Sequence, residues 1–147
     1  MNESEKIEMQ IRQESKKCLY REKKIQISDL IRYYENATHH ERWDRLKKSN
    51  YIESIILSYP LEPFILVEFE ESYVIIDGNE RIKSIIDFVN GSLKVTLTIT
   101  EKIDNITYNN LTLSRKNQIM RKNLTALVLN ESTDNETLYH IYHSLNI

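Results

Sequence analysis

Cysteine, glycine and proline are scarce in this sequence of 147 residues, and a long apolar run is missing altogether. The one cysteine, Cys18, excludes an internal disulfide and a zinc site built on several cysteines. The N-terminal segment is polar and charged, so it lacks the pattern of a secretory signal, and no segment is long enough to cross a membrane. We therefore expect a cytoplasmic protein with no membrane partner.

Charge of one sign is not in excess either, because the net charge is −2 at pH 7. The chain as a whole is therefore not a polycation built for nucleic acid. Two short stretches are nonetheless basic, one at residues 16–24 and one at residues 42–48. Each is either a solvent-exposed helix face or a local contact for nucleic acid.

The rest of the composition is that of a globular protein, with 40% apolar and 29% charged residues. A length of 147 residues fits one domain with its own hydrophobic core. Residues 1–24 are rich in Glu, Lys, Arg and Gln and have few apolar positions, so we expect a charged helix at the periphery. Residues 25–147 are expected to form a single α+β domain.

Apolar periodicity predicts the elements of this domain. Strands are expected over residues 25–27, 64–67, 73–76, 93–99 and 124–129, and the second and third of these are apolar runs typical of strands covered on both faces. Helices are expected after a cap at Ser28, over 46–58 and 80–90, and from a cap at Ser114 to residue 122. A capping box of Thr133 and Glu136 begins a last helix, expected to bury Leu138, Ile141, Tyr142 and Leu145.

Two of these helices have a clear apolar face. The 46–58 helix is expected to bury Ile52, Ile55, Ile56 and Tyr59, and the 80–90 helix Ile82, Ile85, Ile86 and Val89. Gly91 is placed to end the second helix in a left-handed conformation.

The most informative segment is a predicted strand, a sharp turn and a helix start, Val74-Ile75-Ile76-Asp77-Gly78-Asn79-Glu80-Arg81. Gly78 permits a positive φ or a close ligand approach. The free N–H groups and the positive dipole end of the helix start favour an anion, on which Arg81 would add a bidentate grip. Asp77, Asn79 and Glu80 would hold a divalent ion or orient a water. We expect Asp77 and Arg81 to line one solvent-reachable pocket.

A purely structural interpretation of the same segment remains open. Asp-Gly is a common turn, and Asp77 would then cap the helix with its carboxylate. Arg81 would pair with a carboxylate elsewhere in the chain.

The order of several motifs resembles the N-terminal domain of GmrSD-type modification-dependent restriction systems, which is similar to the ParB/sulfiredoxin-like group. The family has a Trp, an Ile-Glu-Ser helix, a Pro-x-x-Pro link, a strand-Asp-Gly-Gln-Gln-Arg-helix unit and a late Leu-Asn step. The matching segments run from about Ile27 to Asn146 and are Trp43, 52–57, 59–63, 77–81, 82–88, 90–94 and Leu145-Asn146.

The sequence departs from the family in three places. The two Gln of the motif are Asn79 and Glu80 here, and the Gln-Arg pair before the Trp is replaced by Thr38-His39-His40-Glu41. The second basic contact is then missing or supplied by Arg42. The family often continues into an HNH nuclease domain, whereas this chain stops at Ile147 without an HNH pattern, so we expect it to lack the DNA-cutting module.

The resemblance implies a small mixed sheet flanked by helices, and a regulatory domain of a phage-defence or restriction system that binds a nucleoside triphosphate. Gly78, Asn79 and Arg81 would hold phosphate, and Asp77, Glu80 and Arg81 would serve catalysis if the nucleotide is hydrolysed. Asp77 and Glu80 would hold Mg²⁺. The alternative is a non-catalytic module that binds DNA or a partner protein; direct nuclease activity is disfavoured, because carboxylates are too few near the motif.

Three further expectations concern single residues. His140 and His143 stand three residues apart on a predicted helix, but two ligands without a third make a poor metal site, and His39-His40 lies in a polar connector. Trp43 is expected to pack rather than to stack on a base, with stacking as the alternative. We also expect a homodimer, or a complex with a second protein, built on either the last helix or the charged N-terminal helix.

Overall fold

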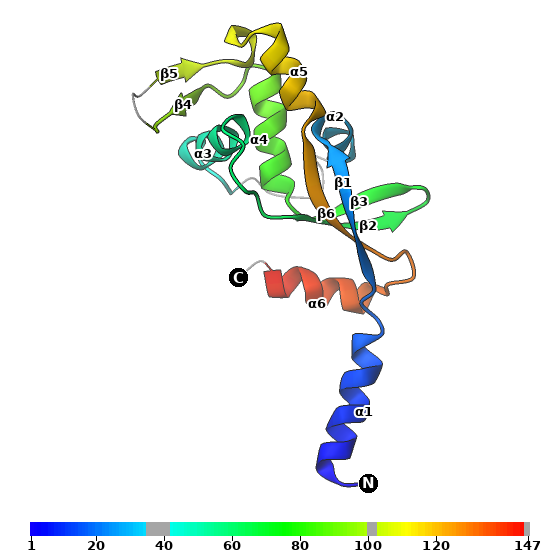
Figure 1. Cartoon of the computed structure of the whole chain (residues 1–147). Coiled ribbons are helices and arrows are strands. Elements are labelled where there is room, and N and C mark those ends of the chain that lie inside the picture. The colour runs from blue at the N-terminus through cyan, green and yellow to red at the C-terminus, as the bar shows by residue number, and fades with distance from the viewer. Residues whose placement is uncertain (35–41, 100–102, 146–147) are drawn as a thin grey trace.

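A computed structural model describes residues 1–34, 42–99 and 103–145 of the chain (Figure 1). Over these ranges the chain is a mixed α+β fold with six α-helices and a small mixed sheet. The strands of this sheet lie in the order β1 (Tyr20–Gln26), β6 (Asn123–Leu129), β2 (Phe64–Phe69) and β3 (Ser72–Asp77). β6 runs antiparallel to β1 and parallel to β2. In the described ranges, every helix is too short or too polar to cross a membrane.

The β2–β3 hairpin turns where the sequence predicts it. Glu70 and Glu71 form the turn with φ of 49° and 63°, the left-handed values that match the twist of a tight hairpin. β3 lies at the edge of the sheet, and Ile75 alone of its six residues is buried. The expectation of a second strand covered on both faces is therefore wrong for 73–76, because apolar composition does not distinguish a central strand from an edge strand.

One face of the sheet carries the main core. The helices on this side include α2 (Ile27–Leu30), α3 (Arg45–Ile56), α4 (Asn79–Val89) and α5 (Leu113–Arg121), and α4 stands beside α3 in the middle of the molecule (Figure 1). Ile52 and Ile55 of α3 and Ile82 and Ile85 of α4 are buried, as predicted, whereas Tyr59 is 40% exposed. Gly91 ends α4 with a φ of 89°, also as predicted.

A second, two-stranded sheet of β4 (Val95–Leu97) and β5 (Ile103–Ile106) lies against α3, and the short 3₁₀ helices η1 (Ile31–Tyr33) and η3 (Tyr108–Asn110) complete the described elements. The predicted 93–99 strand is thus shorter than expected. Ile99, at its end, is 59% exposed and lies outside β4.

The predicted N-terminal helix, over residues 1–24, is longer than the helix that the structure shows. α1 (Glu3–Ser15) ends before residue 16, and residues from Tyr20 belong to β1. Pairing with β6 decides this, because Tyr20–Gln26 pairs with Asn123–Leu129 along its whole length. Arg21 also reaches past β6 to Glu68 of β2, with two hydrogen bonds of 3.1 and 3.0 Å. Tertiary pairing here overrides a helix-like composition. Ile27 begins α2 rather than ending a strand, so Ser28 lies inside the helix and does not cap it.

Two other helix starts differ from the prediction by one or two residues. Thr112, not Ser114, caps α5. Asp134 caps α6 (Asn135–Leu145), because its carboxylate accepts from Thr137 N at 2.7 Å, so the Thr133–Glu136 capping box does not form. No residue of α6 is fully buried: its inner residues Leu138 and Ile141 are half-buried, and Tyr142 and Leu145 are exposed, which corrects the predicted burial of all four.

Candidate functional site

The turn between β3 and α4 requires glycine at residue 78. Gly78 has a φ of 123°, a conformation that side chains disfavour. A Cβ at this position would stand 2.2 Å from Cδ1 of Phe64, whose buried ring fills the space beside the turn. The aromatic ring therefore fixes the path by which the chain leaves the sheet and enters α4.

Arg81 is buried beneath this turn, with 8% of its surface exposed. Its Nη1 donates to the carbonyl oxygens of Glu62 at 2.8 Å and Pro63 at 3.3 Å, and its Nη2 pairs with Asp77 Oδ2 at 3.1 Å. Its Cζ lies 4.3 Å from the centroid of the Phe64 ring. The guanidinium thus joins the proline link, the end of β3 and the start of α4. The expectation that Arg81 lines a solvent-reachable pocket is wrong.

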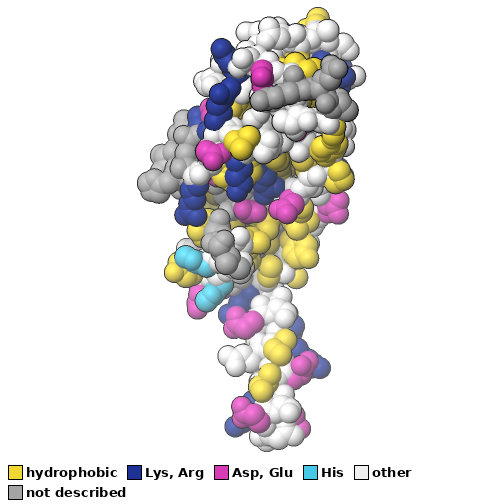
Figure 2. Space-filling model, turned by 90° about the vertical axis from the view of Figure 1, so that its left-hand side faces the viewer, with side chains coloured by type: hydrophobic (Ala, Val, Ile, Leu, Met, Phe, Trp, Pro, Cys, Tyr) yellow, Lys and Arg dark blue, Asp and Glu magenta, His cyan; other side chains and the backbone are white. Residues whose placement is uncertain are grey.

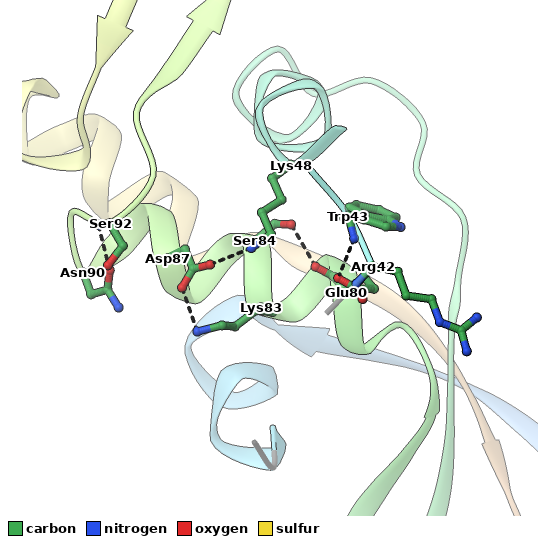
Figure 3. Close-up of polar contacts among 9 residues, drawn as sticks. All are labelled: Arg42, Trp43, Lys48, Glu80, Lys83, Ser84, Asp87, Asn90 and Ser92. Atoms are coloured by element: carbon green, nitrogen blue, oxygen red, sulfur yellow. Dashed lines mark hydrogen bonds and ion pairs between the residues drawn. The ribbon is translucent and has the colours of Figure 1, made fainter. Parts of the chain in front are cut away.

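Glu80 holds the segment that precedes α3. Its carboxylate accepts from the backbone N–H of Arg42 and, at 3.4 Å, from that of Trp43 (Figure 3). The Arg42 side chain extends past Glu80 and is exposed. Arg42 is consequently placed beside the start of α4, although sequence reasoning named it only as a substitute contact.

The start of α4 has no side-chain cap. The first helical hydrogen bond is donated by Ile82 N to Gly78 O at 3.0 Å. Among residues 1–34, 42–99 and 103–145, nothing accepts from the backbone N–H groups of Asn79, Glu80 and Arg81, so Asp77 does not play the capping role considered for it. Three unpaired N–H groups at the positive end of a helix dipole are a favourable place for an anion.

The carboxylates of the motif are already engaged within the chain. Asp77 Oδ2 pairs with Arg81, but the Asp77 side chain keeps 30% of its surface exposed. Glu80 serves the two amides described above. In the described part of the chain, no three His, Cys, Asp or Glu side chains converge on a possible metal position, and this includes His140 and His143. His39 and His40 lie outside the described residues.

Two aromatic side chains lie behind this segment. Trp43 is half-buried and packs edge-to-face on Tyr51, with ring centroids 5.9 Å apart, while Lys47 Nζ lies 4.9 Å from the Trp43 ring centroid. These contacts agree with the predicted packing role of Trp43. The Tyr51 hydroxyl is buried and has no hydrogen-bond partner among the described residues, and its burial raises the Tyr51 pKa to about 12 against the opposing charge of Arg81.

A buried ion cluster holds α3 against α4. Asp87 on α4 is 8% exposed and pairs with Lys48 of α3 at 3.0 Å and with Lys83 at 2.9 Å (Figure 3). Arg42, Arg45 and Lys47 lie nearby in sequence and are exposed. Figure 2 looks onto the α3 side and shows Lys and Arg side chains on this face, with Asp and Glu side chains among them. The α4 start is therefore bordered by exposed cations, Arg42 among them.

Comparisons of the chain with family models, curated proteins and solved structures gave no match. The resemblance to the GmrSD-type domain therefore rests on the order of the sequence motifs alone.

Proposed function

We propose that this chain is a regulatory domain that binds a nucleoside triphosphate, with phosphate held at the start of α4. The observation that carries the proposal is the placement of the exposed Arg42, which Glu80 holds beside the backbone N–H groups of Asn79, Glu80 and Arg81, for which no described residue is an acceptor. Anions are stabilised by helix N-termini, and arginine adds a planar, bidentate donor. Gly78 and Asn79 take the phosphate-binding roles that the family resemblance implies.

Arg81 has a different role in this proposal from the one that the motif suggests. Its guanidinium is committed to Asp77 and to two carbonyl oxygens, so it positions the turn rather than gripping phosphate. Arg42 supplies the second basic contact in its place. The fold, in this proposal, belongs to the ParB/sulfiredoxin-like group, in which the strand-turn-helix unit presents the site.

Mg²⁺ enters this site with the triphosphate, since the ion is commonly bound by phosphates and one or two carboxylates. Asp77 is the carboxylate open to the ion. Arg81 engages its Oδ2 atom, but the side chain is partly exposed, so Oδ1 can serve as the ligand. Glu80 is held by the Arg42 and Trp43 amides and is not placed to activate a water. The geometry thus favours binding of the nucleotide over its hydrolysis.

The test is calorimetric titration of the full chain with ATP and with GTP, in the presence and absence of Mg²⁺. We expect binding that Arg42→Ala weakens about tenfold, the effect of losing one charge-assisted hydrogen bond. Arg45→Ala is the matched control, because it removes an exposed arginine of the same surface that lies at the start of α3 rather than beside Glu80. Absence of binding to either nucleotide, or equal loss in the two variants, would refute the site.

A second candidate function is a non-catalytic contact to DNA. The observation that favours it is the exposed basic group of Arg42, Arg45 and Lys47 beside a half-buried Trp43. If these three cations each neutralise one phosphate, the logarithm of the binding constant for duplex DNA should fall with the logarithm of salt concentration with a slope of about −3. A nucleotide site predicts instead that ATP binds and that DNA does not.

A further inference from the structure

The helix α1 stands away from the rest of the chain (Figure 1). None of its 13 residues is buried. Ile7 and Ile11 lie one turn apart on the same face and are 51% and 53% exposed. A single helix of about 12–15 residues is marginally stable in water, so a helix of this length ordinarily needs a surface to pack against.

The back of the four-stranded sheet offers such a surface. One row across it consists of Tyr20, Leu129, Val67 and Val74, which are neighbours on β1, β6, β2 and β3. Leu129 and Val67 are 3% and 7% exposed and lie apart from the main core cluster, while Tyr20 and Val74 at the ends are 62% and 42% exposed. The middle of this row is therefore covered and its two ends are open, although α6 contacts β3 at one of these ends.

The adjoining row on the same face is less well covered. Leu127 and Ile65 are paired across β6 and β2 and are half-buried. Phe69 lies on the same face of β2, on the other side of the first row, and is 54% exposed. Rows on one face of a strand repeat every two residues, about 6.6 Å, and packed helices lie about 8–10 Å apart. A second helix beside α6 would therefore lie over the incompletely covered row.

The charges of α1 complement those of α6 in an antiparallel arrangement. The first turn of α1 is acidic, with Glu3 and Glu5, and its end is basic, with Arg12 followed by Lys16 and Lys17. α6 has the same order, because its start carries Asp134 and Glu136 and its last turn carries His143. An antiparallel arrangement therefore sets the acidic end of each helix against the basic end of the other. Antiparallel packing also opposes the two helix dipoles favourably.

The hinge between α1 and β1 determines whether α1 packs on the sheet of its own chain or on that of a second copy. Only residues 16–19 separate the two elements; they contain no glycine, and each has a negative φ. A short hinge of this kind resists the sharp reversal that would lay α1 on its own sheet, and such hinges favour exchange between two copies. We propose that the protein forms a homodimer in which α1 of each copy lies antiparallel to α6 on the back of the other copy's sheet.

The test measures the molar mass of the full chain by light scattering over a range of concentrations. The variant Ile7→Lys/Ile11→Lys changes the apolar stripe of α1, and Met9→Lys is its control, because Met9 is 45% exposed on another side of the same helix. On the receiving surface, Tyr139→Lys is paired with Leu113→Lys, an exposed residue of α5. Lysine is a good helix former, so far-UV circular dichroism should show folded protein in all four.

The proposal expects a dimer for the wild type and both controls, and a dissociation constant raised at least about tenfold by Ile7→Lys/Ile11→Lys and by Tyr139→Lys. A monomeric wild type would overturn it, and would be the result if α1 folded back on its own chain. A dimer that the α1 variant leaves intact would overturn it as well.

Discussion

The carboxylate of Glu53 on α3 accepts hydrogen bonds from both the backbone N–H and the hydroxyl of Thr98, just after β4. One turn earlier on the helix, Ser49 Oγ accepts from Thr96 N at 3.0 Å. The edge of the small sheet is thus completed by side chains of a helix rather than by another strand. This relationship fixes β4 against α3, on the side of the molecule that also carries Arg42.

Replacing Glu53 with Ala should therefore destabilise the fold. Glu53 is 9% exposed, and its loss removes the acceptor of the N–H and hydroxyl of Thr98, an exposed residue at which water replaces part of the lost bonding, so the cost is about 1 kcal/mol. The free energy of unfolding in urea measures the effect. Glu131→Ala, at an exposed position, is the control and should change this free energy by less than about 0.5 kcal/mol. Equal effects of the two substitutions would show that the Thr98 contacts do not stabilise the fold.

Alanine substitutions at the two glycines distinguish the stability lost to backbone strain from the stability lost to steric overlap. Gly78 and Gly91 both have positive φ, so alanine at either position costs about 1–2 kcal/mol. Gly78→Ala also drives a methyl group into the Phe64 ring, which adds about 1–3 kcal/mol, whereas a Cβ at Gly91 meets nothing within 4 Å. Thermal unfolding should therefore show the larger loss for Gly78→Ala. Similar losses would mean that the Phe64 ring moves aside freely.

Because Arg81 holds the turn before α4 in place, its substitution should destabilise the protein even in the absence of a ligand. Arg81→Ala removes three hydrogen bonds and leaves Asp77 without its partner, so the free protein should lose about 2–4 kcal/mol. Arg81→Lys should restore little of this, because one ammonium group cannot reproduce the planar set of donors. Chemical denaturation of the three proteins without nucleotide is the measurement. Unchanged stability in Arg81→Ala would return Arg81 to the list of phosphate-binding residues.

The raised pKa of Tyr51 predicts that the protein loses stability at high pH. Its pKa is raised to about 12 in the folded chain from the ordinary tyrosine value of 10.0, so the folded state retains a proton that the unfolded state has lost between these values. The associated stability is present below pH 10 and is lost as the pH rises toward 12, by about 2–3 kcal/mol in total.

Tyr51→Phe isolates this contribution from the titration of lysines. Within residues 1–34, 42–99 and 103–145 the buried hydroxyl has no hydrogen-bond partner, so its removal should leave stability unchanged or increased at pH 7. The difference in unfolding free energy between the variant and the wild type should then grow in favour of the variant between pH 10 and 12. A constant difference across this range would contradict the buried position of the hydroxyl.

The sequence by itself determined the elements whose apolar residues repeat with a clear period. α3 and α4 were predicted from Ile52, Ile55, Ile82 and Ile85, and β6 from its alternating core residues, because burial of one face imposes that period. The position of the strand-turn-helix unit was predicted from the turn residues Asp77-Gly78. A turn that demands a positive φ selects glycine, and this demand is local.

Only the tertiary structure decided how the polar groups are used. β1 is a strand because β6 pairs with it, although its residues are mostly charged, and α6 stays half-exposed because no further described element covers it. Arg81 is occupied by Asp77 and by the carbonyls of Glu62 and Pro63, and Glu80 by the amides before α3. Apart from Asp77, which stands four residues before Arg81, these partners are backbone atoms, which every residue possesses. Their positions arise from packing and leave no trace in the pattern of side chains along the chain.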